Sequence, residues 1–323
     1  MTYYINKANV IMMDMRYRAI CMLNVPNKRN YSNSMQPAFT IVELLVVIAV
    51  IGILAVITIV SYVGITNRAT IASIQSDLTN ASTILKLDQM TGNDNFPTTL
   101  ALANGGKGIA SSQIMDSIIY VPDNTSNPKN FCLQYRKGAN TYAVDSISQP
   151  TTGVCLQNLV TNGDFSQGST GWSVHNIPGG VFANNEFVGT ATVSGAKITD
   201  SGIPFTSGHK YYMRAYIKAD STAVFVFSYD GVNSFYAYNN GSGNYALTSG
   251  VFTSGNTTSN TGQFQMVREG RSSGWTEIRA KQGMLVDLTA SFGAGNEPTK
   301  TQMDTIMNSY SNNWFDIVAK ANL

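Results

Sequence analysis

A single carboxylate lies at the start of the most apolar stretch of this sequence. Residues 44–67, which follow Glu43, contain no charged side chain. As a helix they would measure about 36 Å, enough to cross a bilayer with some tilt. A carboxylate inside hydrocarbon costs roughly 2.5–3.5 kcal/mol, but near a helix N-terminus it meets the positive end of the helix dipole. This placement predicts ion-pairing chemistry for Glu43, and an ordinary membrane anchor with an acid near its interface is the alternative.

The thiols are a second set of reactive groups. The chain has three cysteines, Cys21, Cys132 and Cys155. Between the last two, the segment YRKGANTYAV predicts a β-hairpin with its turn at residues 138–140, which can bring both thiols together. As a disulfide the pair would add about 3 kcal/mol in the chain-entropy model. The membrane run suggests export to an oxidising space and favours the disulfide, and two buried free thiols are the alternative.

Side chains suited to catalysis are sparse. His175 and His209 are the two histidines, and neither lies in a nucleophile motif. The segment GGKGIA at residues 105–110 lacks the spacing of a phosphate-binding loop and predicts a turn. Carboxylate pairs for glycoside hydrolysis have little support, because only 12% of the chain is charged. We therefore expect a protein that is not an enzyme, and keep a membrane-anchored glycan-active enzyme as an alternative.

Composition bounds the architecture that must position these groups. The 323 residues suggest about two domains, and the net charge of +2 gives no indication of a nucleic-acid partner. Because charged residues are few, the polar surface must consist largely of Ser, Thr, Asn and Gly. That composition suits a β-rich extracellular protein.

One long helix is predicted over residues 39–92, with residues 39–62 as its membrane part. Beyond the membrane part, apolar residues recur at spacings of three and four, which predicts one stripe packed on a soluble head. This stripe consists of Ile71, Ile74, Leu78, Ala81 and Leu85. Residues 1–38 are polar, and their cations outnumber their single acid, Asp14. They predict a cytoplasmic leader, since positive charge before an apolar run holds that end in the cytoplasm.

The rest of the chain predicts a small head over residues 93–157 and a β-sandwich over residues 158–323. Strand-like runs separated by turn signals recur about every ten residues in the second region, which is typical of a sandwich. Near its end, Thr299 is a predicted helix N-cap, with Met303 and Met307 on one face of the helix. The predicted fold class is therefore α+β: a long N-terminal helix, a small head and an all-β jelly roll or β-sandwich.

The stretch AFTIVELLVVIAVIGILAVITIVSYVGITNRA, residues 38–69, resembles the N-terminus of type IV pilins and type II secretion pseudopilins. By this resemblance, prepilin peptidase cuts between Ala38 and Phe39 and then methylates the new amine of Phe39. Glu43 is the fifth mature residue and pairs with the Phe39 amine of a neighbouring subunit during assembly. The family more often has Gly where this chain has Ala38, and many members carry a Pro within residues 57–62, where this chain has none. The pair Cys132 and Cys155 also resembles the pilin disulfide region.

The C-terminal region carries a second resemblance. The segments NLVTNGDFSQGSTGWSV (158–174), GHKYYMRAYIKAD (208–220) and MLVDLTASFGAGNEPTKTQMD (284–304) resemble parts of carbohydrate-binding-module jelly rolls. Such folds often hold a structural calcium, for which Asp164 and Asp287 are candidate ligands, and no other cofactor is expected. Sugar binding needs exposed aromatic faces, and core packing of the same rings is the alternative. The candidate rings are Tyr212, Tyr216, Tyr229, Tyr236 and Tyr238.

These resemblances predict a type IV pilin-like structural subunit, minor or located at the tip, that displays a β-sandwich for adhesion or glycan binding. A pseudopilin of a type II secretion or DNA-uptake system is the main alternative. The implied partners are prepilin peptidase, the inner-membrane assembly machinery, other pilin subunits, membrane lipid before assembly and a surface glycan. The implied location is the cytoplasmic membrane, single-pass with the N-terminus inside, and afterwards an extracellular pilus.

Overall fold

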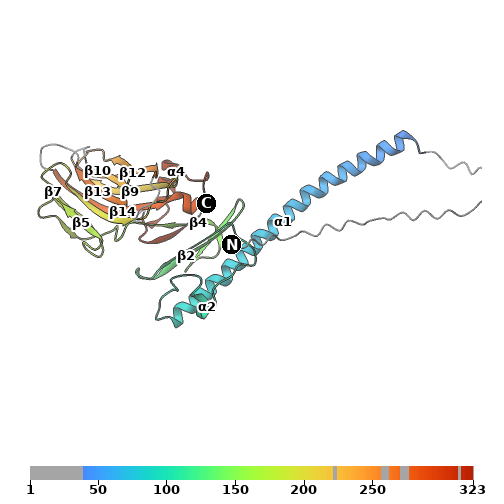
Figure 1. Cartoon of the computed structure of the whole chain (residues 1–323), viewed down its shortest axis with the longest axis horizontal. Coiled ribbons are helices and arrows are strands. Elements are labelled where there is room, and N and C mark those ends of the chain that lie inside the picture. Colours follow the sequence, from blue (N-terminus) through green and yellow to red (C-terminus); the bar gives the residue numbers. More distant parts are fainter. Residues whose placement is uncertain (1–38, 221–223, 256–261, 270–275, 312–313, 323) are drawn as a thin grey trace, which may run out of the picture. The chain divides into compact units, whose positions relative to one another are not determined.

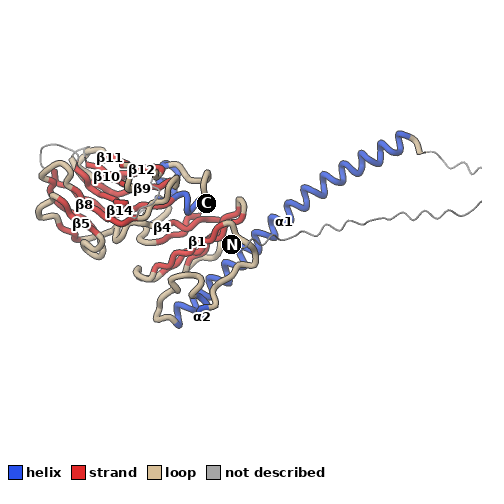
Figure 2. The backbone as a smooth tube through the Cα atoms, in the orientation of Figure 1, coloured by secondary structure: helices blue, strands red, loops and turns tan. Residues whose placement is uncertain are grey.

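The computed structural model describes residues 39–220, 224–255, 262–269, 276–311 and 314–322, and the predicted α+β class is confirmed (Figures 1 and 2). The predicted leader, residues 1–38, with Ala38 and Cys21, lies outside the described residues. The helices are α1 (Ile41–Thr91), α2 (Ala103–Gly106), α3 (Leu288–Phe292) and α4 (Lys300–Met307). The strands are β1 (Ser117–Asp123), β2 (Asn130–Lys137), β3 (Asn140–Asp145), β4 (Thr151–Gln157), β5 (Trp172–His175), β6 (Val181–Ala183), β7 (Glu186–Ala191), β8 (Lys197–Ile203), β9 (Lys210–Lys218), β10 (Val224–Tyr229), β11 (Ser234–Tyr238), β12 (Tyr245–Thr253), β13 (Gly262–Glu269), β14 (Thr276–Asp287) and β15 (Val318–Asn322).

The chain divides into two compact units, Met1–Val60 and Ser61–Leu323. In the first unit, the described residues 39–60 form the start of α1, and every one of their side chains is exposed. In the second unit, the continuation of α1 buries one stripe, as its spacing predicts. Ile74, Leu78, Ala81 and Leu85 are fully buried against an apolar cluster that includes Phe131 and Leu133 of β2.

The head contains an antiparallel sheet in the order β1-β2-β3-β4-β15, which we call the head sheet. The predicted hairpin is confirmed: Leu133 pairs with Val144 and Tyr135 with Tyr142. Gly138 begins its turn with a φ of +58°, a left-handed conformation that favours glycine. The head sheet also contains the last strand of the chain, because β15 pairs with β4.

Two further five-stranded antiparallel sheets form a β-sandwich. The first sandwich sheet has the order β11-β10-β13-β8-β5, and the second has the order β12-β9-β14-β7-β6. Alternate side chains of each strand enter one shared core: Tyr211, Met213, Ala215 and Ile217 from β9, and Val224 and Val226 from β10. The side chains between them therefore lie on the outer faces, where the predicted ligand-binding tyrosines must be sought.

A separate apolar cluster joins the head sheet to the sandwich within the second unit. It combines Val154 and Leu156 of β4 and Ala319 of β15 with Met284 and Val286 of β14. The helix α4 covers this cluster with Met303 and Met307, and Thr299 caps the helix through a reciprocal pair of hydrogen bonds with Gln302, as predicted. Since the sandwich strands lie between β4 and β15 in sequence, the sandwich is an insertion into the head sheet. The predicted boundaries at residues 93, 157 and 158 stay predictions.

Candidate functional site

The first candidate site is the start of α1. The Thr40 amide N–H and hydroxyl each donate to Glu43 Oε2 at 2.8 Å, and the Glu43 amide N–H donates to Thr40 Oγ1 at 3.2 Å. This capping box satisfies donors that the first helical turn leaves free and holds the carboxylate beside the helix N-terminus. Phe39, which the predicted cleavage would make the first residue, immediately precedes it and is 79% exposed.

The helix that follows is long and apolar enough to cross a membrane. None of the membrane-length apolar window in α1 is buried within the protein. In water this surface would be strongly unfavourable, since each fully exposed Leu, Ile or Val forgoes roughly 1.5–3 kcal/mol of burial. The side chains of residues 41–60 therefore need lipid or other apolar helices around them.

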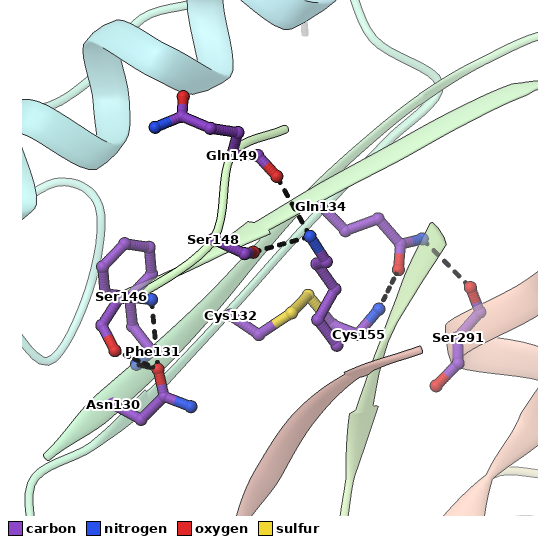
Figure 3. Close-up of a disulfide and its surroundings, with 10 residues drawn as sticks. Asn130, Phe131, Cys132, Gln134, Ser146, Ser148, Gln149, Cys155 and Ser291 are labelled. Atoms are coloured by element: carbon purple, nitrogen blue, oxygen red, sulfur yellow. Dashed lines mark hydrogen bonds between the residues drawn. A yellow bond between two sulfur atoms is a disulfide. The ribbon is translucent and has the colours of Figure 1, made fainter. Parts of the chain in front are cut away.

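The predicted disulfide is confirmed and lies in the middle of the head sheet (Figure 3). Cys132 of β2 and Cys155 of β4 are bonded and almost completely buried. In the head sheet β3 lies between these two strands, and its ladder with β4 is short. It consists of two residue pairs, Tyr142 with Thr152 and Ala143 with Thr151. The disulfide therefore holds β4, and with it β15, to a sheet that few hydrogen bonds would join.

A buried amide beside the disulfide extends this connection. Gln134 is fully buried; its Oε1 accepts from the Cys155 amide N–H at 2.7 Å, and its Nε2 donates to the carbonyl of Ser291 in α3 at 3.0 Å (Figure 3). Both ends of the amide are therefore satisfied, which makes the burial of this polar side chain favourable. Gln134 joins β2, β4 and the end of the sandwich in one network that the sequence pattern did not reveal.

Three of the five candidate tyrosines gather on the outer face of the first sandwich sheet. Tyr236 and Tyr238 are 49% and 61% exposed, and their rings stack with centroids 6.3 Å apart. Tyr229 lies 6.5 Å from Phe227, and Phe225 contacts both exposed rings at 5.3 and 5.0 Å. We call these five residues the aromatic patch.

Amide side chains adjoin the aromatic patch. Gln263 and Gln265 of β13 lie opposite Tyr229 and Phe227, and Gln265 Nε2 donates to Gln263 Oε1 at 2.7 Å. Gln265 is buried, so Gln263 is the amide of this pair that reaches the surface. Exposed rings beside an amide group can stack on the apolar face of a sugar and hydrogen-bond its hydroxyls.

Tyr212 and Tyr216 have different surroundings, on the outer face of the second sandwich sheet. Tyr212 is fully buried, and its hydroxyl donates to Asp304 Oδ1 at 2.5 Å, so its ring is not exposed to a ligand as the sequence analysis expected. The reason is that α4 folds over this part of the face, which the alternation within β9 could not reveal. Burial and the adjacent Asp304 also raise the pKa of Tyr212 above its usual value.

Tyr216 lines a groove of about 1130 Å³ on this same face. Other lining residues are Tyr245, Trp314, Asp164 and Asp316. Burial, together with the charges of Asp164 and Asp123, raises the pKa of Asp316 to about 6. The groove therefore combines aromatic rings with carboxylates that repel each other.

The two candidate calcium ligands have separate surroundings. Asp164 Oδ1 accepts from the Ser166 amide N–H, whereas Asp287 caps α3 through Ala290 and its Oδ2 lies 2.8 Å from His209 Nδ1. Among the described residues, no group of three or more His, Cys, Asp or Glu side chains is placed to hold a metal. A calcium ion bound by Asp164 and Asp287 stays a prediction.

Comparison with known proteins identifies the beginning of the chain. Residues 33–59 match the model of the prokaryotic N-terminal methylation motif. This motif implies processing by prepilin peptidase and assembly with other pilins, and together with the long apolar helix it fits a membrane-anchored pilin-like protein that later reaches the surface. No curated protein matches the chain in sequence.

Several solved structures are similar to a part of the chain. A CBM4 structure is 17% identical over 38% of this chain and 97% of its own, with a TM-score of 0.32. The N-terminal cellulose-binding domain of β-1,4-glucanase C from Cellulomonas fimi is 17% identical over 40% of this chain and 95% of its own, with a TM-score of 0.30. The enzymatically active domain of tailspike protein 4 from bacteriophage CBA120 is 12% identical over 40% of this chain and 21% of its own, with a TM-score of 0.29. The resemblance to prepilins stated from the sequence thus has a counterpart in the methylation motif.

Proposed function

We propose that this protein is a type IV pilin-like structural subunit, minor or at the tip, that presents its β-sandwich at the cell surface for adhesion. One observation carries the proposal. The methylation motif covers residues 33–59, and in the structure every side chain of residues 39–60 is exposed. Such a helix is stable in lipid before assembly and in a bundle of like helices afterwards. The leader then lies in the cytoplasm, and the residues after the membrane part lie outside.

The size of the sandwich supports a minor or tip position. The inserted strands β5 to β14 form two five-stranded sheets in addition to the head sheet. A domain of this bulk on every subunit would crowd a fibre, whereas a tip subunit has free space around it. The Gln134 network and the shared apolar cluster hold the sandwich to the head, as a protein that transmits tension from a bound surface requires. The disulfide adds to this within the head sheet, where it holds β4, the strand that leads into the sandwich.

Two substitutions of Glu43 test assembly separately from membrane insertion. In Glu43→Gln the amide oxygen still accepts from Thr40 and preserves the capping box, but the negative charge is lost. In Glu43→Ala both the charge and the capping box are lost. We expect both variants to insert in the membrane, because each replaces a charge with a less polar group, and both to be depleted from sheared surface fibres. Wild-type amounts of Glu43→Gln in the fibres would contradict a role for its charge in assembly.

The aromatic patch is the proposed site for a surface glycan, without catalysis. Tyr236 and Tyr238 are its exposed rings, and each substitution to Ala should weaken glycan binding roughly tenfold if the ring stacks on a sugar. Val232→Ala is the matched control, since Val232 is 64% exposed on the turn between β10 and β11. A glycan array with the full chain would identify the ligand, and equal binding by all three variants would contradict the site.

The same assays separate this proposal from its alternatives. A wild-type pseudopilin would be absent from sheared surface fibres and found in a secretion or DNA-uptake complex, and the Glu43 variants would be depleted from that complex instead. A glycan-active enzyme would release shortened products from the bound glycan, whereas the proposed adhesin leaves the glycan intact.

A further inference from the structure

Arg214 occupies an unusual position for a charged residue. It lies on the outer face of the second sandwich sheet, between Tyr212 and Tyr216 on β9, and opposite Ser249 of β12 and Met284 of β14. Its exposed fraction is 0%, and it is the largest fully buried side chain among the described residues. A positive charge is thus removed from water in the layer that covers this face.

None of the three guanidinium nitrogens of Arg214 has a hydrogen-bond partner within the described part of the chain. The guanidinium carbon lies 5.4 Å from the centroid of the Tyr216 ring, a cation–π contact that leaves its five N–H donors unsatisfied. The adjacent carboxylate of Asp304 is already engaged by Tyr212, Ser249 and Lys300. The described residues therefore supply Arg214 with no hydrogen-bond acceptor.

The segment that covers this face adds two more polar groups without partners. The indole Nε1 of Trp314 and the hydroxyl of Tyr310 are buried and unpartnered among the described residues, and both side chains pack on the apolar cluster that contains Tyr212. Asp316, farther along the segment, interacts with Asp123 and Asp164. The layer thus holds a cation and a neutral N–H donor but lacks a free anion.

Burying an unpaired charge is costly, and proteins ordinarily compensate it with an opposite charge that also accepts its hydrogen bonds. We propose that a small monovalent anion, of the size of chloride or a carboxylate group, binds to the Arg214 guanidinium in the layer between β9 and the side chains of Tyr310 and Trp314. The bound anion holds Tyr310 and Trp314 to the sandwich, and the residues from Trp314 onward lead into β15 of the head sheet. The site is independent of the aromatic patch and of the role of Glu43.

Anion-dependent thermal stability of the full chain in detergent tests this site. Sodium bromide or sodium acetate is titrated at constant ionic strength against sodium MES, whose anion is too bulky to enter. We expect a saturable increase in Tm of roughly 2–4 °C at about five times the dissociation constant. Arg214→Met should abolish the increase. Arg279→Met is the matched control and should retain it, because Arg279 lies on the same face but is paired with Glu186 and Glu277.

Two results would overturn the proposal: a wild-type Tm that does not respond to either anion, or a response that persists in Arg214→Met. If Arg214→Met does not fold, anomalous diffraction from a bromide-soaked crystal of the wild-type protein decides the question. A bromide peak at the Arg214 guanidinium supports the site, and water alone in that position excludes it.

Discussion

Removal of the disulfide should destabilise the head by an amount that follows from its place in the chain. Cys132 and Cys155 are separated by 23 residues in sequence. Closing a loop of that length lowers the entropy of the unfolded chain, which stabilises the folded state by about 3 kcal/mol at 25 °C. Reduction, or the double substitution Cys132→Ala and Cys155→Ala, should therefore lower Tm by roughly 6–12 °C for a domain of this size. Because only two residue pairs join β3 to β4, the loss should be greatest at β4 and β15.

Thermal denaturation combined with hydrogen exchange measures both parts of this expectation. The oxidised wild type is compared with the reduced wild type, which has the same side chains, and with the double variant under reducing conditions. Protection of the β4 and β15 amides should fall in both reduced forms, and that of the buried part of α1 should fall less. A change in Tm below about 2 °C, or unchanged exchange at β15, would show that the ladder alone holds this edge.

Three other substitutions test the packing and the electrostatics. Leu78→Ala should lower the free energy of unfolding by about 2–5 kcal/mol, because Leu78 is fully buried against the head. Leu54→Ala is the control: its position is 56% exposed, so denaturant unfolding of the head should not change. Equal effects of the two substitutions would contradict the assigned buried face of α1. Burial raises the pKa of Asp200 to about 6. Between about pH 4 and 6 the folded state therefore binds more protons than the unfolded state. As a result, the free energy of unfolding falls as the pH rises through this window. Asp200→Asn still accepts from the Thr161 amide N–H. It should therefore be more stable than the wild type by up to about 3 kcal/mol at pH 7 and equal to it below pH 4. Urea unfolding at both pH values measures this difference, and equal stability at pH 7 would refute the cost of burying the charged carboxylate.

Local sequence signals predicted the parts of the structure that depend on residues close together in the sequence. The spacing of Ile74, Leu78 and Leu85 predicted the buried stripe of α1, and the segment between the cysteines predicted the hairpin and the disulfide. The motif around Glu43 predicted the match to the methylation motif. In each of these cases the periodicity or spacing is set within a few turns or one hairpin.

Long-range packing accounts for what the sequence did not predict. The alternation in β9 placed Tyr212, Arg214 and Tyr216 on one face. In the structure α4 and the side chains of Tyr310 and Trp314 cover that face, so Tyr212 and Arg214 are buried. The pairing of β15 with β4 joins residues more than 150 positions apart, for which no short-range pattern exists. The aromatic patch could not be predicted from the sequence, because it depends on the exposure of Tyr236 and Tyr238 and on the register between β10 and β11.

The N-terminal residue of the protein found at the cell surface tests the central claim most directly. Appendages are sheared from cells, the subunit is separated, and its N-terminal peptide is sequenced by mass spectrometry. If the chain is a processed pilin-like subunit, the peptide begins at Phe39 and carries one methyl group on its α-amine. A surface-fraction chain that retains residues 1–38 would contradict the account.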